Sequence, residues 1–211
     1  MVYSTVDFEN RMSDLLGATS QYIFLSSSRV YAESLEPITE SSPRLLDVSV
    51  DQSFLSSDDY ALAKARQEDL LRNSGNRNWT IIRPYITSGV ERLQLGVMEK
   101  ESWLFRALQG RTIVLSADIN MRVTTLTYGL DVSRGIKSIV GNSLAFGEVF
   151  HIASHQSLLW RDVFEIYLDV LKDELGYAPK TLLLGIKDFE ECHFSKYQIL
   201  YDRMYDRRID S

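Results

Sequence analysis

Three side chains in the first third of the chain have types and spacings that suit redox chemistry on an alcohol. Ser27 follows the apolar run at residues 22–25, and Tyr60 and Lys64 lie four residues apart. On a helix, that spacing places the phenol and the ammonium group on one face. The ammonium group favours the ionised phenol, which can then exchange a proton nearer to neutral pH. Together with a hydroxyl at a strand end, this pair suggests alcohol–carbonyl redox chemistry.

The Tyr-xxx-Lys spacing has a simpler interpretation when it is taken alone. The chain contains 11 tyrosines, so one such spacing is expected by chance. A solvated helix face is then the more frequent explanation, and serines after a strand usually form a polar turn. Only the order and context of further motifs favour a catalytic site.

These residues require a strand and a helix to position them, and the sequence pattern predicts an α/β fold. Parallel strands are predicted at 22–27, 79–83 and 148–152, with helices at 5–19, 58–73 and 131–140 beside them. Ser56, Ser57 or Asp58 is expected to cap the helix that carries Tyr60. Side chains at the carboxyl ends of such strands leave the core and face a crevice, which is where Ser27 is expected to lie.

A smaller α/β part is predicted from residues 102–121 and 157–211. It contains a short helix through residue 107, a strand at 112–115, an amphipathic helix at 160–175 and a strand at 180–184. The apolar stripe of the long helix is expected to be core; it comprises Val163, Phe164, Tyr167, Leu168, Leu171 and Leu175. Residues 32–57 are polar and contain two prolines, which fits either a connecting loop or the flexible rim of a substrate cleft.

Composition narrows the class of protein. The net charge of -6 and the pI of about 5.1 argue against a nucleic-acid-binding surface. No apolar run reaches membrane-spanning length, and residues 1–10 lack the pattern of a signal peptide. Cys192 has no partner for an internal disulfide, and no histidine has a second ligand at metal-binding spacing. A soluble cytoplasmic protein with no metal and no membrane partner is therefore expected.

Four motifs, in order, resemble the extended short-chain dehydrogenase/reductase family in its NAD-dependent epimerase/dehydratase branch. Residues 23–31 are similar to the family's strand, Ser-Ser pair and Val-Tyr, residues 37–40 to its Pro-x-x-Glu, and residues 60–64 to its Tyr-xxx-Lys. Residues 79–89 resemble the strand and loop that contain Leu-Arg-Pro and then Tyr-Gly. The resemblance continues more loosely over nearly all of the chain. It implies a truncated Rossmann-type parallel sheet with a small α/β substrate-binding part.

The resemblance also implies an activity, which is redox chemistry on a nucleotide-linked sugar with NAD or NADP as cofactor. Tyr60 is then the general base for a sugar hydroxyl, and Lys64 promotes its ionisation and holds the nicotinamide ribose. Ser27 matches the family's Ser/Thr that donates a hydrogen bond to the reacting oxygen. Pro84 and Tyr85 are implied to flank the nicotinamide.

Ser28 and Arg122 are the implied substrate contacts. The arginine matches one that contacts the nucleotide diphosphate in relatives, although it lies about two residues further from Asp131 than is usual. One departure narrows the reaction. The dehydratase branch has Asp-Glu directly after the Ser/Thr, whereas this chain has Ser28-Arg29. A 4,6-dehydratase is thus disfavoured, and epimerisation or keto-reduction remains.

The family's Gly-x-x-Gly-x-x-Gly turn, which holds the cofactor pyrophosphate at a helix N-terminus, has no counterpart in the 211 residues. We therefore expect a family member that lacks roughly its first third, with residues 1–101 as the C-terminal half of the Rossmann-type core. Residues 102–211 are expected to be a mixed region, whose helix 131–140 and strand 148–152 return to the sheet. The alternative is a catalytically silent remnant or interaction module. The expected partners are a second copy of the chain or a separate subunit that carries the N-terminal half.

Overall fold

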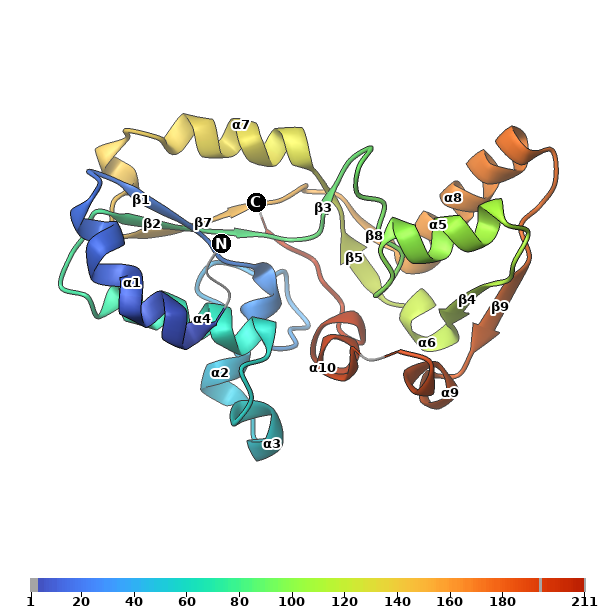
Figure 1. The fold of residues 1–211 in the computed structure, drawn as a ribbon, viewed down its shortest axis with the longest axis horizontal. Coiled ribbons are helices and arrows are strands. Elements are labelled where there is room, and N and C mark those ends of the chain that lie inside the picture. The colour runs from blue at the N-terminus through green and yellow to red at the C-terminus, as the bar shows by residue number, and fades with distance from the viewer. Residues whose placement is uncertain (1–3, 194, 211) are drawn as a thin grey trace.

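The computed structural model of the protein describes residues 4–193 and 195–210. Its central element is a three-stranded parallel sheet of β1 (Tyr22–Leu25), β2 (Trp79–Pro84) and β7 (Glu148–Ile152), in the order β1-β2-β7 (Figure 1). In this register Phe24 lies opposite Ile81, and Ile81 lies opposite Val149. The predicted parallel sheet is confirmed.

Helices cover both faces of this sheet. α1 (Thr5–Gly17) and α4 (Tyr60–Arg72) lie on one face, and α7 (Gly129–Ile139) lies on the other (Figure 1). The first face buries apolar side chains of two helices and two strands, namely Phe8, Leu16, Phe24, Leu71, Trp79 and Ile81. Burial of side chains of this size contributes roughly 1.5–3 kcal/mol each. α7 approaches β7 so closely that a Cβ at Gly135 would lie 2.9 Å from the Ile152 side chain, and glycine avoids this clash.

The second part of the chain packs around a long amphipathic helix, α8 (Trp160–Leu175), whose Val163, Phe164 and Leu171 are buried. The prediction that its apolar stripe is core is confirmed. The other elements of this part are α5 (Lys100–Leu108), α6 (Ala117–Asn120), α9 (Ile186–Glu191) and the parallel pair of β4 (Ile113–Ser116) with β9 (Thr181–Leu184). Two further short pairs join β3 (Thr87–Ser88) to β6 (Thr127–Tyr128) and β5 (Val123–Thr125) to β8 (Ser157–Leu159).

Two local predictions need correction. Residues 32–57 are not merely a polar loop, because they form α2 (Leu45–Val48) and α3 (Gln52–Leu55) and bury Ile38 and Phe54. Asp59, rather than residues 56–58, caps α4, since its side chain accepts a hydrogen bond from the Ala61 amide at 3.0 Å. Tyr60 is therefore the first residue of the helix.

Residues 195–210 pack against the rest of the chain and bury charge. α10 (Lys196–Gln198) continues into a π-helical turn at Ile199–Arg203, and Asp202, Arg203 and Arg207 are all buried. Asp202 pairs with both arginines, and its Oδ1 lies 3.0 Å from the Arg207 Nε. Burial raises the pKa of Asp202, but the charges of Arg203 and Arg207 outweigh burial and hold it below its usual value. Across residues 4–193 and 195–210, no helix has both the length and the hydrophobicity needed to cross a bilayer.

A chain of buried hydrogen bonds links β2 to β7. Arg83 donates to both carboxylate oxygens of Glu68, at 2.8 and 2.5 Å, and to the Tyr31 hydroxyl at 2.5 Å. That hydroxyl lies 2.6 Å from Nε2 of His151, and Nδ1 of His151 lies 2.9 Å from the carbonyl oxygen of Asp210. A carbonyl oxygen can only accept, so Nδ1 carries the proton. Burial lowers the pKa of His151 and so favours the neutral imidazole, whose Nε2 then accepts from Tyr31.

The buried His151 is expected to make the protein less stable as the pH falls below about 6.5, the value for an unperturbed histidine. Burial lowers its pKa, and the charge of Arg83 acts in the same direction, against opposing effects of Asp210 and Glu40. The unfolded chain therefore binds a proton at a pH where the folded chain does not. This contribution to stability is complete above the unfolded pKa and is lost as the pH falls toward the lower, folded value.

Chemical unfolding of the wild type and of His151→Gln between pH 5 and pH 8 measures this dependence. We expect the wild type to lose more free energy of unfolding than the variant as the pH is lowered. Burial also lowers the pKa of His193, but His193 is present in both proteins, so their difference isolates His151. Equal slopes for the two proteins would show that His151 is not held neutral.

Candidate active site

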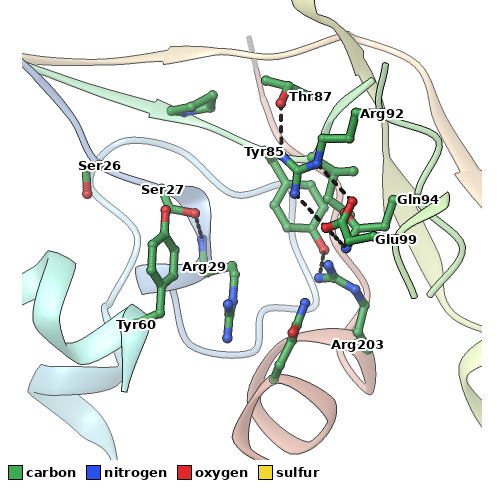
Figure 2. Close-up of a pocket in the computed structure, with 13 residues that line it drawn as sticks. Ser26, Ser27, Arg29, Tyr60, Tyr85, Thr87, Arg92, Gln94, Glu99 and Arg203 are labelled. Carbon is green, nitrogen blue, oxygen red and sulfur yellow. Dashed lines mark hydrogen bonds and ion pairs between the residues drawn. The ribbon is translucent and has the colours of Figure 1, made fainter. Parts of the chain in front are cut away.

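A cavity of about 520 Å³ opens at the carboxyl ends of β1 and β2, and we call it the strand-end cavity (Figure 2). Its position follows from the parallel sheet, because the strands deliver their last side chains to one edge. The cavity is lined by Ser26, Ser27, Arg29, Tyr60, Pro84, Tyr85, Ile86, Thr87, Arg92, Gln94, Glu99, Gln198 and Arg203. It therefore joins residues from the sheet, from α4, from the segment before α5 and from the C-terminal residues.

Ser27 and Tyr60 meet at one end of this cavity. Tyr60 begins α4 and is 42% exposed, whereas Ser27 is nearly buried. Figure 2 shows the phenol hydroxyl pointing toward the Ser27 side chain. The Ser27 oxygen accepts a hydrogen bond from the Arg29 amide at 3.2 Å, which fixes its direction. Among the described residues its own proton has no acceptor, so it is available to a ligand.

Lys64 lies one helical turn after Tyr60, behind the cavity wall. Its Nζ is 5.9 Å from the centre of the Tyr60 ring and 4.6 Å from that of Phe24. The same nitrogen donates to the carbonyl oxygen of Leu25 at 2.9 Å. Burial lowers the pKa of Lys64, and the carboxylate of Glu68 opposes this shift. The carbonyl at the end of β1 therefore orients the ammonium group toward the strand that also supplies Ser27.

Pro84 and Tyr85 form the floor of the cavity. Tyr85 is almost fully buried, and its hydroxyl donates to Oδ1 of Asp202 at 3.2 Å and accepts from Nη1 of Arg203 at 3.3 Å. Burial raises the pKa of Tyr85 to about 12, with a further contribution from the Asp202 charge. The Tyr85 side chain is thus an uncharged and fixed part of the cavity floor.

Ser28 and Arg122 do not reach the strand-end cavity. Ser28 is fully buried, because the 3₁₀ turn at Ser28–Val30 directs its hydroxyl inward to the carbonyl oxygen of Arg83, at 2.9 Å. Arg122 precedes β5, and its carbonyl oxygen is fixed by the Trp160 amide at 3.0 Å. The substrate contacts predicted for these two residues therefore have no counterpart on the cavity wall.

The sequence analysis did not identify the residues on the cavity wall opposite Ser27 and Tyr60. Arg92 lies 3.1 Å from the carboxylate of Glu99 and donates to the Thr87 hydroxyl at 3.1 Å. Arg203 donates from Nε to the carbonyl oxygen of Gly96 at 2.8 Å. The one available signal was the glycine pair that brackets Arg92, at Gly89 and Gly96, which is typical of a bent segment.

The backbone of the wall is strained at one position. Ile86 has a φ of +24°, a region that β-branched residues rarely adopt. It follows Tyr85 directly and packs in the buried core. Strained residues of this kind concentrate at functional sites, where the surrounding structure holds them.

The charge of the cavity favours an anionic ligand. Three arginines, Arg29, Arg92 and Arg203, line it against one carboxylate, that of Glu99. Guanidinium groups present forked donors that match phosphate and carboxylate oxygens. A positively charged cavity that also holds a phenol and a serine hydroxyl suits a ligand with both an anionic group and hydroxyls.

No protein-family model matches the chain, and no curated protein matches it either. Solved structures do. UDP-glucuronic acid 4-epimerase from Bacillus cereus, in complex with UDP-glucuronic acid and NAD, superimposes with a TM-score of 0.65 at 18% identity, over 86% of this chain and 54% of that one. The Bordetella bronchiseptica enzyme WbmH, in complex with NAD⁺, gives 0.64 at 15% identity, over 97% and 58%. A dTDP-glucose 4,6-dehydratase from Bacillus anthracis, in complex with NAD, gives 0.60 at 17% identity, over 86% and 54%.

The chain thus spans only about half of the length of these structures, 54% of the epimerase and 58% of WbmH. The similarity covers both the parallel sheet and the second part of the chain, since 85–97% of the chain is superimposed. The protein therefore shares the α/β fold of these solved structures, over about half of their length.

Proposed function

We propose that this chain supplies the catalytic and substrate-binding residues of an NAD(P)-dependent epimerase or keto-reductase that acts on a nucleotide-linked sugar. The observation that carries the proposal is the strand-end cavity, in which Arg29 lies beside Ser27 and Tyr60, and Arg92 and Arg203 line the opposite wall. A sugar hydroxyl suits the serine and the tyrosine, and a diphosphate suits the arginines. The UDP-glucuronic acid and NAD in the B. cereus structure of the same fold support this proposal.

In this proposal Tyr60 is the general base. Its phenol oxygen accepts the proton of the reacting sugar hydroxyl, while Ser27 donates a hydrogen bond to the same oxygen. Lys64, fixed by the Leu25 carbonyl, supplies positive charge behind the phenol. The nicotinamide cofactor, when bound, accepts the hydride from the carbon that bears this hydroxyl. Tyr85 remains neutral and closes the floor of the site.

The residues present fit one end of such a cofactor. Pro84 and Tyr85 offer a wall for a nicotinamide, and Tyr60 lines the same cavity for the ribose, with Lys64 behind it. The 211 residues contain no glycine-rich phosphate loop, so the pyrophosphate and adenosine require residues outside this sequence. We propose that these belong to a further segment of a longer protein, a second copy or a separate subunit.

The reaction is proposed to be epimerisation or keto-reduction rather than dehydration. A dehydratase needs an acid and a base beside the reacting sugar to eliminate water. Ser28 and Arg29 follow the catalytic serine here, and Ser28 is fully buried with its hydroxyl bonded to the Arg83 carbonyl. Neither side chain can serve as a carboxylic acid.

The second candidate is a catalytically silent interaction module, and one observation favours it. Within residues 4–193 and 195–210, β1 pairs only with β2, so its outer edge is open, and Leu25 on that strand is 50% exposed. An open, apolar strand edge is a surface for another chain. We propose a cytoplasmic location for both candidates, and the module would act without bound cofactor.

Titration of the 211-residue chain with NAD(H) and NADP(H), followed by the fluorescence of the reduced cofactor, tests whether this chain supplies a cofactor site without residues from elsewhere. We expect binding tighter than about 1 mM if this chain, or an assembly of its copies, completes a cofactor site. Size-exclusion chromatography on the same samples detects such an assembly. A folded chain that binds neither cofactor would favour the silent module, or a site that needs residues from elsewhere.

A further inference from the structure

The strand β9 lies at the edge of the second part of the chain, and among the described residues it pairs with β4 alone. Figure 1 shows it on the outside of this part, beyond β4. Its Leu182 and Leu183 point to opposite faces of the strand pair, and they are 47% and 49% exposed. Residues 181–184 contain no charge and no proline, which are features that protect an edge strand from pairing with another chain.

The unpaired backbone groups of β9 belong to Thr181 and Leu183. The Ile113 amide donates to the carbonyl oxygen of Lys180 at 2.8 Å, so the backbone of Lys180 faces β4. In a strand the N–H and C=O groups of one residue point to the same edge, and successive residues alternate. Leu182 therefore also faces β4, whereas Thr181 and Leu183 present their N–H and C=O groups at the open edge.

This edge is complementary to a second copy of itself. Two copies of β9 can run antiparallel about a twofold axis at Leu182, with Thr181 of each copy opposite Leu183 of the other. The outward N–H and C=O groups of both residues are then all paired, and the two Leu182 side chains lie directly opposite each other. Such self-matching of one surface is what a twofold axis requires. The result is a continuous sheet in the order β4-β9-β9-β4.

The charges that flank β9 favour the same antiparallel arrangement. The exposed Lys180 precedes the strand, and α9, which contains three acids and one lysine, follows it. Pairing centred on Leu182 places Lys180 opposite Leu184 of the second copy, beside the start of its acidic helix. Parallel pairing would instead bring the two lysines together and the two acidic helices together, and like charges in such positions are destabilising.

We propose that two copies of this chain associate through β9, by antiparallel pairing of the two strands about Leu182. Each strand has only 4 residues, so the contact is smaller than a standard protein interface, and we expect a Kd of about 10–500 µM. The inference does not depend on the proposed function, because β9 contributes no residue to the strand-end cavity.

Sedimentation equilibrium of the full chain between about 5 and 500 µM measures this association. We expect the wild type to form dimers, and Leu182→Lys and Leu182→Glu each to weaken dimerisation by about tenfold or more, because like charges then face each other at the axis. An equal mixture of the two variants should restore dimers, since opposite charges then meet. Leu130→Lys, at a leucine of α7 that is also 47% exposed, is the matched control and should dimerise as the wild type does.

Thr181→Pro is the second kind of variant. It removes an outward N–H at the first residue of the strand, where proline is tolerated, and it leaves the pairing with β4 intact. Circular dichroism establishes that each variant is folded, and weaker dimerisation of Thr181→Pro supports the proposal even if the charged variants do not fold. A wild type that is monomeric at about 500 µM would overturn the proposal. Dimers that survive both Leu182→Lys and Thr181→Pro would place the contact elsewhere, and a mixture of the charged variants that stays monomeric would overturn the pairing about Leu182.

Discussion

Replacing Glu68 by glutamine is expected to lower the free energy of unfolding by about 3–5 kcal/mol. The carboxylate makes a two-point contact with Arg83, at 2.8 and 2.5 Å, and both side chains are excluded from solvent. It also lies 3.4 Å from Arg44 and accepts from the Ser26 hydroxyl at 2.5 Å. Without its charge, the buried guanidinium group of Arg83 would face no anion. The amide of glutamine would also offer its own donors where acceptors are needed.

Chemical denaturation with linear extrapolation measures this loss. Asp131→Asn is the matched control, since it removes the partner of Arg134 in an exposed ion pair on α7 and should cost less than about 1 kcal/mol. A loss below about 1 kcal/mol for Glu68→Gln would mean that water reaches the Arg83 pair in solution. Because Ser26 follows β1 directly and binds Glu68, the same variant is also expected to loosen the end of β1.

The elements that local patterns encode were predictable from the sequence. The apolar run at residues 148–152 and the helical stripe at 160–175 recur at the same residues in the structure. Both signals depend only on near neighbours, because a strand or helix face is set by the spacing of apolar residues. The rule that parallel strands end at one edge placed Ser27 at a crevice, and the family resemblance placed Tyr60, Pro84 and Tyr85 with it; all four line the strand-end cavity.

Contacts between distant residues were not predictable. Arg203 lies in a charged C-terminal stretch without periodicity, yet it is buried and reaches the carbonyl of Gly96, 107 residues earlier. The two adjacent serines show the same limit on a smaller scale. A local pattern cannot decide which of them faces the cavity, because the 3₁₀ turn that buries Ser28 depends on its bond to Arg83 in the next strand.

Residues at the end of β1 contact both the buried Glu68–Arg83 ion pair and the candidate catalytic residues. The carbonyl of Leu25 holds Lys64, the hydroxyl of Ser26 binds Glu68, and Ser27 lines the cavity. Three consecutive residues thus connect the ammonium group, the buried ion pair and the hydroxyl donor. Tyr60 is the remaining member, and it is held by its place at the first turn of α4 rather than by side-chain bonds.

The second large effect is therefore expected for Tyr60→Phe. In the assembly that binds cofactor, this variant should reduce kcat for the nucleotide sugar by about 10²–10⁴-fold, the contribution typical of general acid–base catalysis. The change removes only the phenol oxygen, and the ring would keep its contact with Arg29 at 5.1 Å. Affinity for the nucleotide sugar should consequently stay within about twofold, so that the loss appears in kcat and not in binding.

Steady-state turnover and calorimetry on the same preparations separate these two quantities. Tyr128→Phe is the matched control, because Tyr128 is exposed and lies outside the strand-end cavity, and it should retain wild-type kcat. If Tyr60→Phe turns over at more than about a tenth of the wild-type rate, Tyr60 is not the general base. The proton would then have to pass to another group, and Ser27 is the cavity hydroxyl toward which Tyr60 points.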